Sequence, residues 1–182
     1  YDFGNTTKLR ESFFAYDYKG YGSAPVNGSL TSREAFLDGG NAIVNFTYDS
    51  FGNLLEQKDA LGRKANYTYG IRDTTNTYTD RVTNAKGHVV NYDYDLGTGN
   101  LRSQIDSNGF ITNLTYDVFG RITKEILPLD SFDFPTKVYE YELDGTPPEK
   151  VKIMQREESG QAGILNTSYF YDGFGRVIQI KS

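Results

Sequence analysis

The chain has 182 residues, and its 19 Lys and Arg against 24 Asp and Glu give a formal net charge of −5. This balance argues against non-specific nucleic-acid binding, which needs a basic face. The chain has no Cys and one His, which excludes disulfides, thiolate metal sites and multi-His metal sites. No apolar run approaches the roughly 18 residues that a membrane helix needs.

Aromatic residues and glycines stand out in the rest of the composition. The chain has 15 Tyr, 12 Phe and 19 Gly, but no Trp and a single Met. Aromatic and β-branched residues separated by frequent Gly, Asn and Asp predict short strands joined by tight turns. A hydrophobic fraction of 37% fits thin sheets with one wet face better than a thick core. The composition therefore predicts an all-β chain.

Residues 1–43 are expected to hold degenerate copies of one turn-forming phrase, Tyr-Asp-x-x-Gly. A shortened copy, Tyr-Asp-Phe-Gly-Asn, opens the chain at 1–5, and Tyr-Asp-Tyr-Lys-Gly restates the turn at 16–20. Asp-Gly-Gly-Asn at 38–41 predicts another turn, and a strand is expected at 43–48. The chain begins in mid-motif, without a Met or a signal segment, so we expect it to be a section of a longer protein.

From residue 44 onwards the phrase becomes clear as Tyr-Asp-x-Phe-Gly-Asn/Arg. It occurs at 48–53, 116–121 and 171–176, and a looser copy with one inserted residue occurs at 94–100. Asp at the first position of a type I turn can accept backbone N–H bonds, while Gly at the fourth tolerates positive φ and can form a bulge. The predicted turn and ladder residues of these copies are Tyr48, Asp49, Gly52, Tyr94, Asp95, Tyr116, Asp117, Gly120, Tyr171, Asp172 and Gly175.

A second turn signal, Asp/Asn-x-x-Gly, alternates with the first. We predict it at three places in the chain: Asp59 to Gly62, Asn84 to Gly87 and Asp106 to Gly109. Together the two signals place a turn about every ten or eleven residues, close to the sum of a mean strand and a short loop. A recurrence of this kind predicts a repeat architecture.

Between the turns, apolar and polar residues alternate with a period of two, which is the pattern of half-buried strands. Phe46 and Tyr48 are expected on one face of a sheet, and Asn45 and Thr47 on the other. Because Tyr recurs at the same point of each hairpin, hairpins that pair side by side would align the rings into a ladder. Each cross-strand aromatic pair would contribute about 0.2–1 kcal/mol. No segment shows a convincing helical stripe.

Residues 127–164 are predicted to be a longer, irregular repeat and not a separate domain. Four of the five Pro residues occur there, and Pro suits edges, bulges and turns better than central strands. Strands are still expected at 138–141 and 151–154, followed by a loop of small residues at 159–163.

We therefore predict one all-β array over residues 1–182, made of repetitive antiparallel β-hairpins. Its clearest repeats are at 44–126 and 165–182, and its most degenerate part is at 1–43. The phrases in the two clear stretches resemble the YD repeat of the Rhs (rearrangement hot spot) family. Phe-Tyr-Asp-Gly-Phe-Gly-Arg-Val-Ile-Gln at 170–179 is especially typical.

That family includes the BC components of insecticidal Tc toxin complexes, polymorphic bacterial toxins and the animal teneurins. The resemblance implies a β-superhelix, in which a long solenoid-like sheet spirals into a hollow shell. In toxin members the shell encloses a cytotoxic C-terminal segment, and in teneurins it supports a cell-surface adhesion module. A secreted or cell-surface location is implied as well. The Asp-Pro-containing autoprotease motif of toxin shells is absent, so self-cleavage and toxin activity are not carried over.

Other functions have weaker support in the sequence. The Asp residues could suggest glycosidase carboxylates, but turn capping explains their positions before a Gly. Calcium needs about six to eight oxygens, whereas each turn offers one carboxylate. His88 is expected to be an exposed strand residue, and no Gly-x-Ser-x-Gly occurs. Chance and strand composition can explain the Asn-x-Ser/Thr triplets, which start at Asn5, Asn27, Asn45, Asn66, Asn113 and Asn166.

The leading hypothesis is a non-enzymatic section of a YD-repeat shell that encloses or scaffolds another segment, such as a toxin, without a cofactor, a metal or a catalytic residue. Its expected partners are the rest of its parent chain, an enclosed C-terminal segment and, through exposed edge strands, other copies of itself. No nucleic acid and no membrane span are expected. The alternative is a module that binds carbohydrate or a cell-surface partner, which predicts an exposed aromatic cluster, for example from 127–168.

Overall fold

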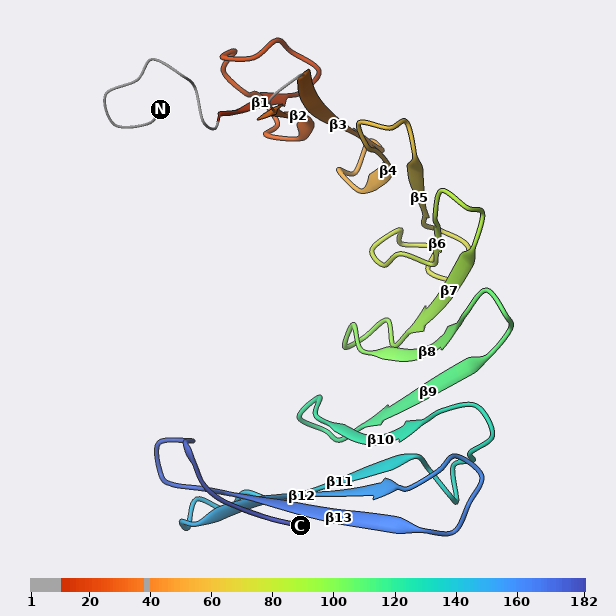
Figure 1. The fold of residues 1–182 in the computed structure, drawn as a ribbon, viewed down its shortest axis with the longest axis vertical. Coiled ribbons are helices and arrows are strands. Elements are labelled where there is room, and N and C mark those ends of the chain that lie inside the picture. The colour runs from red at the N-terminus through yellow and green to blue at the C-terminus, as the bar shows by residue number, and fades with distance from the viewer. Residues whose placement is uncertain (1–10, 38–39) are drawn as a thin grey trace. The chain divides into compact units, whose positions relative to one another are not determined.

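The computed structural model describes residues 11–37 and 40–182, and this part of the chain contains fourteen strands and no helix (Figure 1). The predicted all-β class is therefore confirmed. The turn phrase at 1–5 and part of the turn at 38–41 lie outside the described residues. The strands are β1 (Ser12–Tyr16), β2 (Leu30–Leu37), β3 (Gly40–Tyr48), β4 (Leu54–Lys58), β5 (Lys64–Thr68), β6 (Arg81–Thr83), β7 (Val89–Tyr94), β8 (Leu101–Ile105), β9 (Ile111–Tyr116), β10 (Ile122–Ile126), β11 (Lys137–Glu142), β12 (Glu149–Arg156), β13 (Ile164–Tyr171) and β14 (Val177–Lys181).

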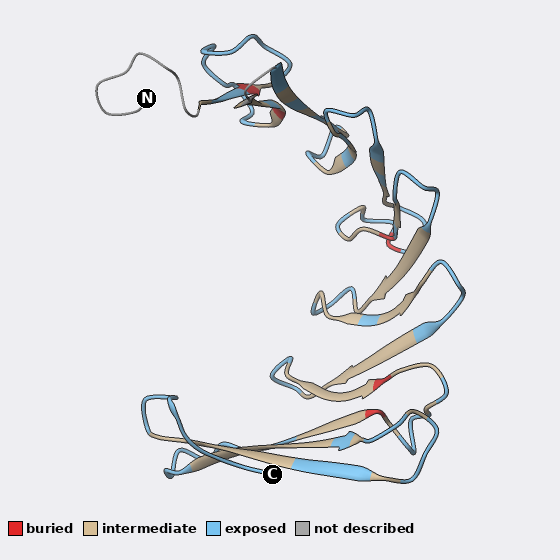
Figure 2. Cartoon of the chain, in the orientation of Figure 1, coloured by how far each residue is buried: buried red, intermediate tan, exposed pale blue. Residues whose placement is uncertain are grey.

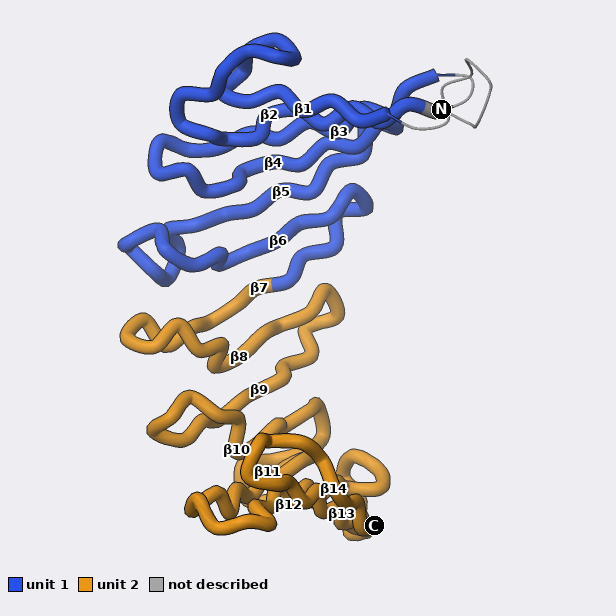
Figure 3. Tube along the Cα trace, turned by 90° about the vertical axis from the view of Figure 1, so that its left-hand side faces the viewer, with its two compact units in different colours: residues 1–90 blue, residues 91–182 orange. Residues whose placement is uncertain are grey.

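The chain divides into two compact units, residues 1–90 and 91–182, and the boundary falls within β7 (Figure 3). In the first unit, β1 to β6 pair antiparallel with their neighbours in chain order. In the second unit, the strands from β7 to β14 do the same. The predicted repetitive antiparallel hairpins are therefore confirmed in both units.

Because neighbouring strands are joined in chain order, successive turns alternate between the two sides of each sheet at which the strands begin and end. We call the side that carries the Tyr-Asp turns the YD edge; the term refers to strand ends and not to the outermost strands. In the first unit it is formed by residues 17–29, 49–53 and 69–80, and in the second by residues 95–100, 117–121, 143–148 and 172–176. The described turns of the opposite edge are 59–63 and 84–88 in the first unit, and 106–110, 127–136 and 157–163 in the second.

The strand residues separate into a polar face and an aromatic face, as the first unit shows. Thr47, Glu56 and Asn66 lie opposite one another on β3, β4 and β5, so their side chains share a face. Phe46 and Tyr48 alternate with Thr47 along β3 and are half-buried, whereas Thr47 is exposed. The period of two in the sequence therefore corresponds to the two faces of the sheet.

The described residues bury very little apolar surface (Figure 2). Among them, the hydrophobic side chains that are nearly inaccessible are Ala15 and Ile126, with 6% and 2% exposure. The aromatic face is half-exposed, because within each unit the strands form a sheet with no second layer packed on it. Stability therefore depends on backbone pairing between strands and on polar contacts that satisfy the turns.

A hydrogen bond from a Tyr side chain connects successive hairpins. Three Tyr hydroxyls each donate, over 2.8 Å, to the carbonyl oxygen of the first residue of the neighbouring strand: Tyr48 to Leu30, Tyr116 to Leu101 and Tyr141 to Ile122. Leu101 lies opposite Tyr94, at a shift in the β7–β8 register. A bulge disrupts the backbone ladder, so a side-chain donor is favourable at such a carbonyl. The alternating pattern in the sequence did not predict this bond.

We expect Tyr116→Phe to lower the free energy of unfolding by about 1 kcal/mol, because the half-buried Leu101 carbonyl loses its hydroxyl donor while the ring is retained. Urea unfolding followed by circular dichroism would measure the change. Tyr139→Phe is the matched control, since the Tyr139 hydroxyl has no hydrogen bond to any described residue. An equal loss of stability in the two variants would contradict this role of the Tyr116 hydroxyl.

Candidate functional site

The Tyr-Asp turn is closed by a single carboxylate, as the turn that starts at Asp117 shows. The Asp117 N–H donates to the Arg121 carbonyl over 2.9 Å, and the Gly120 N–H donates to the Asp117 carbonyl over 3.0 Å. Asp117 Oδ1 accepts the N–H groups of Phe119 and Arg121 at 2.9 and 3.0 Å, and its Oδ2 accepts Arg121 Nε at 2.6 Å. Gly120 has φ of +78°, a conformation in which Gly has no steric penalty.

The same arrangement recurs at the other turns that the sequence singled out. The side-chain oxygen of the first residue accepts the N–H groups two and four positions on at Asp49, Asp59, Asn84, Asp106 and Asp172. Asp95 closes a turn that is one residue longer, where its carboxylate accepts the N–H groups of Gly97 and Thr98 at 3.0 and 2.9 Å. The structure therefore places these side chains in turns.

The turn near the N-terminus corrects the prediction for 16–20. The Lys19 N–H donates to the Tyr16 carbonyl over 2.9 Å and forms a turn at 16–19, but Gly20 does not close the hairpin, because β2 starts ten residues later, at Leu30. Instead the Asp17 N–H donates to the Ser29 carbonyl over 2.8 Å, and Asp17 Oδ1 accepts the Ser29 N–H at 3.0 Å. Gly28, with φ of +80°, occupies the position that Gly120 has in its turn. Residues 18–28 are therefore a long loop inserted into the same turn.

The loop between β5 and β6 contains a turn that the search for Gly missed. Asp73 accepts the N–H groups of Thr75, Thr77 and Tyr78 at 2.9, 2.7 and 3.0 Å, and its side chain is almost inaccessible. Asn76 takes the position of the Gly, with φ of +57°. Asn is one of the few residues that adopt this conformation readily, so the pattern Asp-x-x-Asn could have revealed the turn.

These hydrogen bonds hold the pKa of several turn carboxyls below the usual value of 3.8. The Thr75 hydroxyl is the largest influence on Asp73; burial opposes it, and backbone N–H groups reinforce it, so the pKa falls to about 2. The pKa of Asp172 is lowered first by the Arg176 side chain and then by the Arg176 N–H. Burial is the largest influence on Asp117 and raises its pKa, but the N–H and guanidinium of Arg121 outweigh it.

We expect the turns to lose stability in acid. A carboxyl whose pKa is lower in the folded chain stabilises it above the ordinary pKa of 3.8, and this contribution is lost as the pH falls toward the folded pKa, which is about 2 for Asp73. The urea midpoint should therefore be level down to about pH 5 and fall steadily below it. Asp73→Asn should make this fall shallower. An unchanged pH dependence in that variant would contradict the assignment.

Neighbouring turns of the YD edge also contact one another within each unit. In the second unit, the Arg121 guanidinium lies 4.4 Å from the centre of the Tyr141 ring, which belongs to the next hairpin. In the first unit, Asn53 Nδ2 donates to the Asn76 carbonyl over 2.8 Å. The last residue of a turn, Arg121 or Asn53, therefore binds the Asp of its own turn and also contacts the neighbouring hairpin or loop.

At the opposite edge, a buried carboxylate joins two long loops of the irregular region. Asp130 Oδ2 accepts the hydroxyls of Thr136 and Ser159 at 2.5 and 3.1 Å, and Oδ1 accepts the Gly160 N–H at 2.7 Å. Arg156 Nε lies 3.4 Å from Asp130 Oδ1. Loop 127–136 is therefore tied to loop 157–163, which lies next to it on the same edge.

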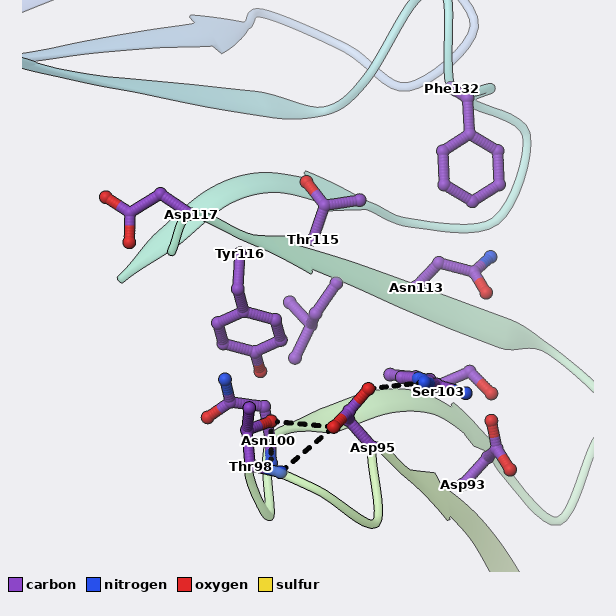
Figure 4. Close-up of a pocket in the computed structure, with 12 residues that line it drawn as sticks. Asp93, Asp95, Thr98, Asn100, Ser103, Asn113, Thr115, Tyr116, Asp117 and Phe132 are labelled. Carbon is purple, nitrogen blue, oxygen red and sulfur yellow. Dashed lines mark hydrogen bonds and ion pairs between the residues drawn. The ribbon is translucent and has the colours of Figure 1, made fainter. Parts of the chain in front are cut away.

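A groove of about 470 Å³ lies on the second unit, over β7, β8 and β9 and beside loop 127–136 (Figure 4). It is lined by Asp93, Asp95, Thr98, Asn100, Arg102, Ser103, Asn113, Leu114, Thr115, Tyr116, Asp117 and Phe132. Asp95 and Asp117 are already engaged in their turns, and Asp95 also pairs with Arg102. The remaining lining combines neutral polar side chains with the acidic Asp93 and with the apolar or aromatic Leu114, Tyr116 and Phe132.

Large aromatic side chains are exposed at both edges. The Phe of the Tyr-Asp turns points to solvent, with 76%, 79% and 86% exposure for Phe51, Phe119 and Phe174. Phe132 and Phe134 in loop 127–136 are also exposed, as the carbohydrate-binding alternative requires. His88 is exposed and immediately precedes β7.

The described residues contain no group of three or more His, Asp or Glu side chains arranged to hold a metal ion. Within the same part of the chain, no helix is long and apolar enough to cross a membrane.

Comparison with known proteins links this geometry to a family. A family model described as RHS Repeat matches residues 94–131, which hold the turns at Asp95 and Asp117. Teneurin-m of Drosophila melanogaster is 32% identical over an alignment of 135 residues, and the match covers 60% of this chain and 5% of teneurin-m. The crystal structure of TcdB2-TccC3 matches 93% of this chain, with a TM-score of 0.71 and 12% sequence identity. The crystal structure of TcdB2-TccC3-TEV matches 94% of this chain, with a TM-score of 0.72 and 10% sequence identity. The chain spans 12% and 14% of those two chains.

The fold and the turns define an all-β repeat protein whose antiparallel sheets are built from Tyr-Asp hairpins. The match of residues 94–131 to the RHS repeat and the similarity to teneurin-m support a fragment of the Rhs/YD-repeat type. The resemblance that the repeated phrase indicated is thereby confirmed, and the structural similarity to TcdB2-TccC3 shows that the fold is shared at low sequence identity.

Proposed function

We propose that residues 1–182 act as one non-catalytic repeat array, a section of a wall that encloses or scaffolds another segment of its parent protein, such as a toxin. The observation that carries this proposal is the repetition of one turn, in which a carboxylate accepts the N–H groups two and four positions on. The turn and ladder residues predicted from the sequence would have this structural role, together with Asp17, Gly28 and Asp73.

The state of the carboxylates supports a structural role over a hydrolytic one. The oxygens of Asp49, Asp117 and Asp172 each accept backbone N–H groups and a side-chain donor from the same turn. A general acid or base must instead present a free oxygen to its substrate. The family resemblance further supports a secreted or cell-surface location, with the rest of the parent chain as the main partner.

An enclosing role predicts that loosening a turn exposes other segments of the full-length gene product. Asp117→Ala leaves the N–H groups of Phe119 and Arg121 without their acceptor, whereas Asp117→Asn keeps one oxygen, as Asn84 does in its own turn. In limited proteolysis mapped by mass spectrometry, we expect segments outside 1–182 to be cut fastest in Asp117→Ala and at an intermediate rate in Asp117→Asn. Equal cutting in all three proteins, despite a lower unfolding midpoint for Asp117→Ala, would contradict enclosure.

The last strand favours self-association of the isolated chain. All five residues of β14 are exposed, and β13 is its pairing partner in the described sheet. An exposed strand edge is a template for another strand. We expect the mass from light scattering to rise with concentration, and Ile178→Lys to reduce this rise, because a charge at an edge disfavours pairing. A strict monomer at high concentration, or an unchanged association in Ile178→Lys, would contradict the prediction.

A further inference from the structure

The YD edge of the second unit carries apolar side chains at the tips of its turns. The four turns, 95–100, 117–121, 143–148 and 172–176, lie on the same side of the sheet (Figure 1). Neighbouring turns on that side are two strands apart, which is about 10 Å in a β-sheet. The side chains that we call the apolar tips are exposed to solvent: Leu96 by 54%, Val118 by 94%, Phe119 by 79% and Phe174 by 86%. This edge therefore presents a row of separate apolar points.

The backbone behind the two Phe tips is satisfied within its own turn. The N–H groups of Asp117 and Gly120 donate to backbone carbonyls, and those of Phe119 and Arg121 donate to Asp117 Oδ1. The turn at 172–176 repeats all four bonds. A backbone N–H that enters hydrocarbon loses its water and must have a partner in the protein. At these four positions the turn keeps its hydrogen bonds when the tip leaves water.

The charges of these turns are also paired locally. Each Tyr-Asp turn of the unit pairs its carboxylate with an Arg: Asp95 with Arg102, Asp117 with Arg121 and Asp172 with Arg176. The Arg121 and Arg176 guanidinium groups lie 5.0 and 5.2 Å from the centres of the Phe119 and Phe174 rings. An Arg beside an apolar group suits the boundary between lipid headgroups and acyl chains. Arg121 and Arg176 are the only basic residues within the four turns, so no unpaired cation is left to attract anionic lipid.

We propose that the YD edge of the second unit docks on a zwitterionic lipid surface, with Val118, Phe119 and Phe174 inserted below the headgroups. A lipid surface can deform around separate points, and each inserted side chain gains by leaving water. The paired charges favour neutral headgroups such as phosphatidylcholine over anionic ones. Only the turn tips enter the lipid, and no strand crosses it. This inference goes beyond the structural role of the array and does not depend on it.

Fluorescence with vesicles of brominated phosphatidylcholine tests the proposal on the whole chain. The chain has no Trp, so Phe119→Trp introduces a single reporter at an apolar tip. We expect its emission to shift to the blue and to be quenched by the brominated acyl chains. Phe110→Trp is the matched control, because Phe110 is 56% exposed in the same unit but ends an Asp-closed turn on the opposite side of the sheet. Its emission should not change.

Variants at the other tips extend the test. In the Phe119→Trp background, Val118→Ser and Phe174→Ser should each weaken partitioning to the vesicles by about tenfold, and added phosphatidylglycerol should not strengthen it. Circular dichroism would verify that each variant is folded. The absence of quenching in Phe119→Trp, equal quenching in Phe110→Trp, or binding that requires phosphatidylglycerol would overturn the proposal. Without vesicle binding, a loss of self-association in Val118→Ser would assign the tips to a second copy instead.

Discussion

The fold depends on one interaction, the acceptance of turn N–H groups by the side chain of the first turn residue. A single layer of strands buries few apolar side chains, so it gains little from a core and cannot offset unpaired backbone groups at its edges. Asp117 Oδ1 resolves this at its turn by accepting two N–H groups at once. With the turn closed, the register of the two flanking strands follows, and register decides which side chains share a face.

Within each unit, the side-chain contacts described above join a hairpin to the hairpins directly beside it. The stability of each hairpin is therefore coupled mainly to that of its neighbours. The Tyr116 hydroxyl binds the strand that precedes its own, and Arg121 packs on a ring of the hairpin that follows. In arrays of this kind, stability is approximately the sum of repeat and nearest-neighbour contributions. A change in one turn therefore affects mainly the hairpins beside it, and a sheet built this way can open locally without unfolding as a whole.

The sequence was sufficient for the strand class, the hairpin order and most turns, because Asp-x-x-Gly has a direct physical meaning. It was insufficient where another residue replaced the Gly, as Asn76 does, or where a loop separated the Asp from its Gly, as between Asp17 and Gly28. The hydrogen bonds from Tyr hydroxyls to carbonyl groups could not be predicted either, since they depend on where the pairing register of two strands shifts. The polar groove depends on how loop 127–136 folds back, which its Pro-containing sequence does not specify.

The inserted loop at 18–28 has a consequence for how such chains can change. Asp17 and Ser29 close the turn with the same two hydrogen bonds that Asp117 and Arg121 use, one between backbone groups and one to the carboxylate, although eleven residues separate the first pair and three the second. Loop length is thus uncoupled from strand register at this position. A turn of the YD edge can therefore accept inserted sequence while the pairing of its flanking strands is preserved, so the surface can diversify without a change in the sheet.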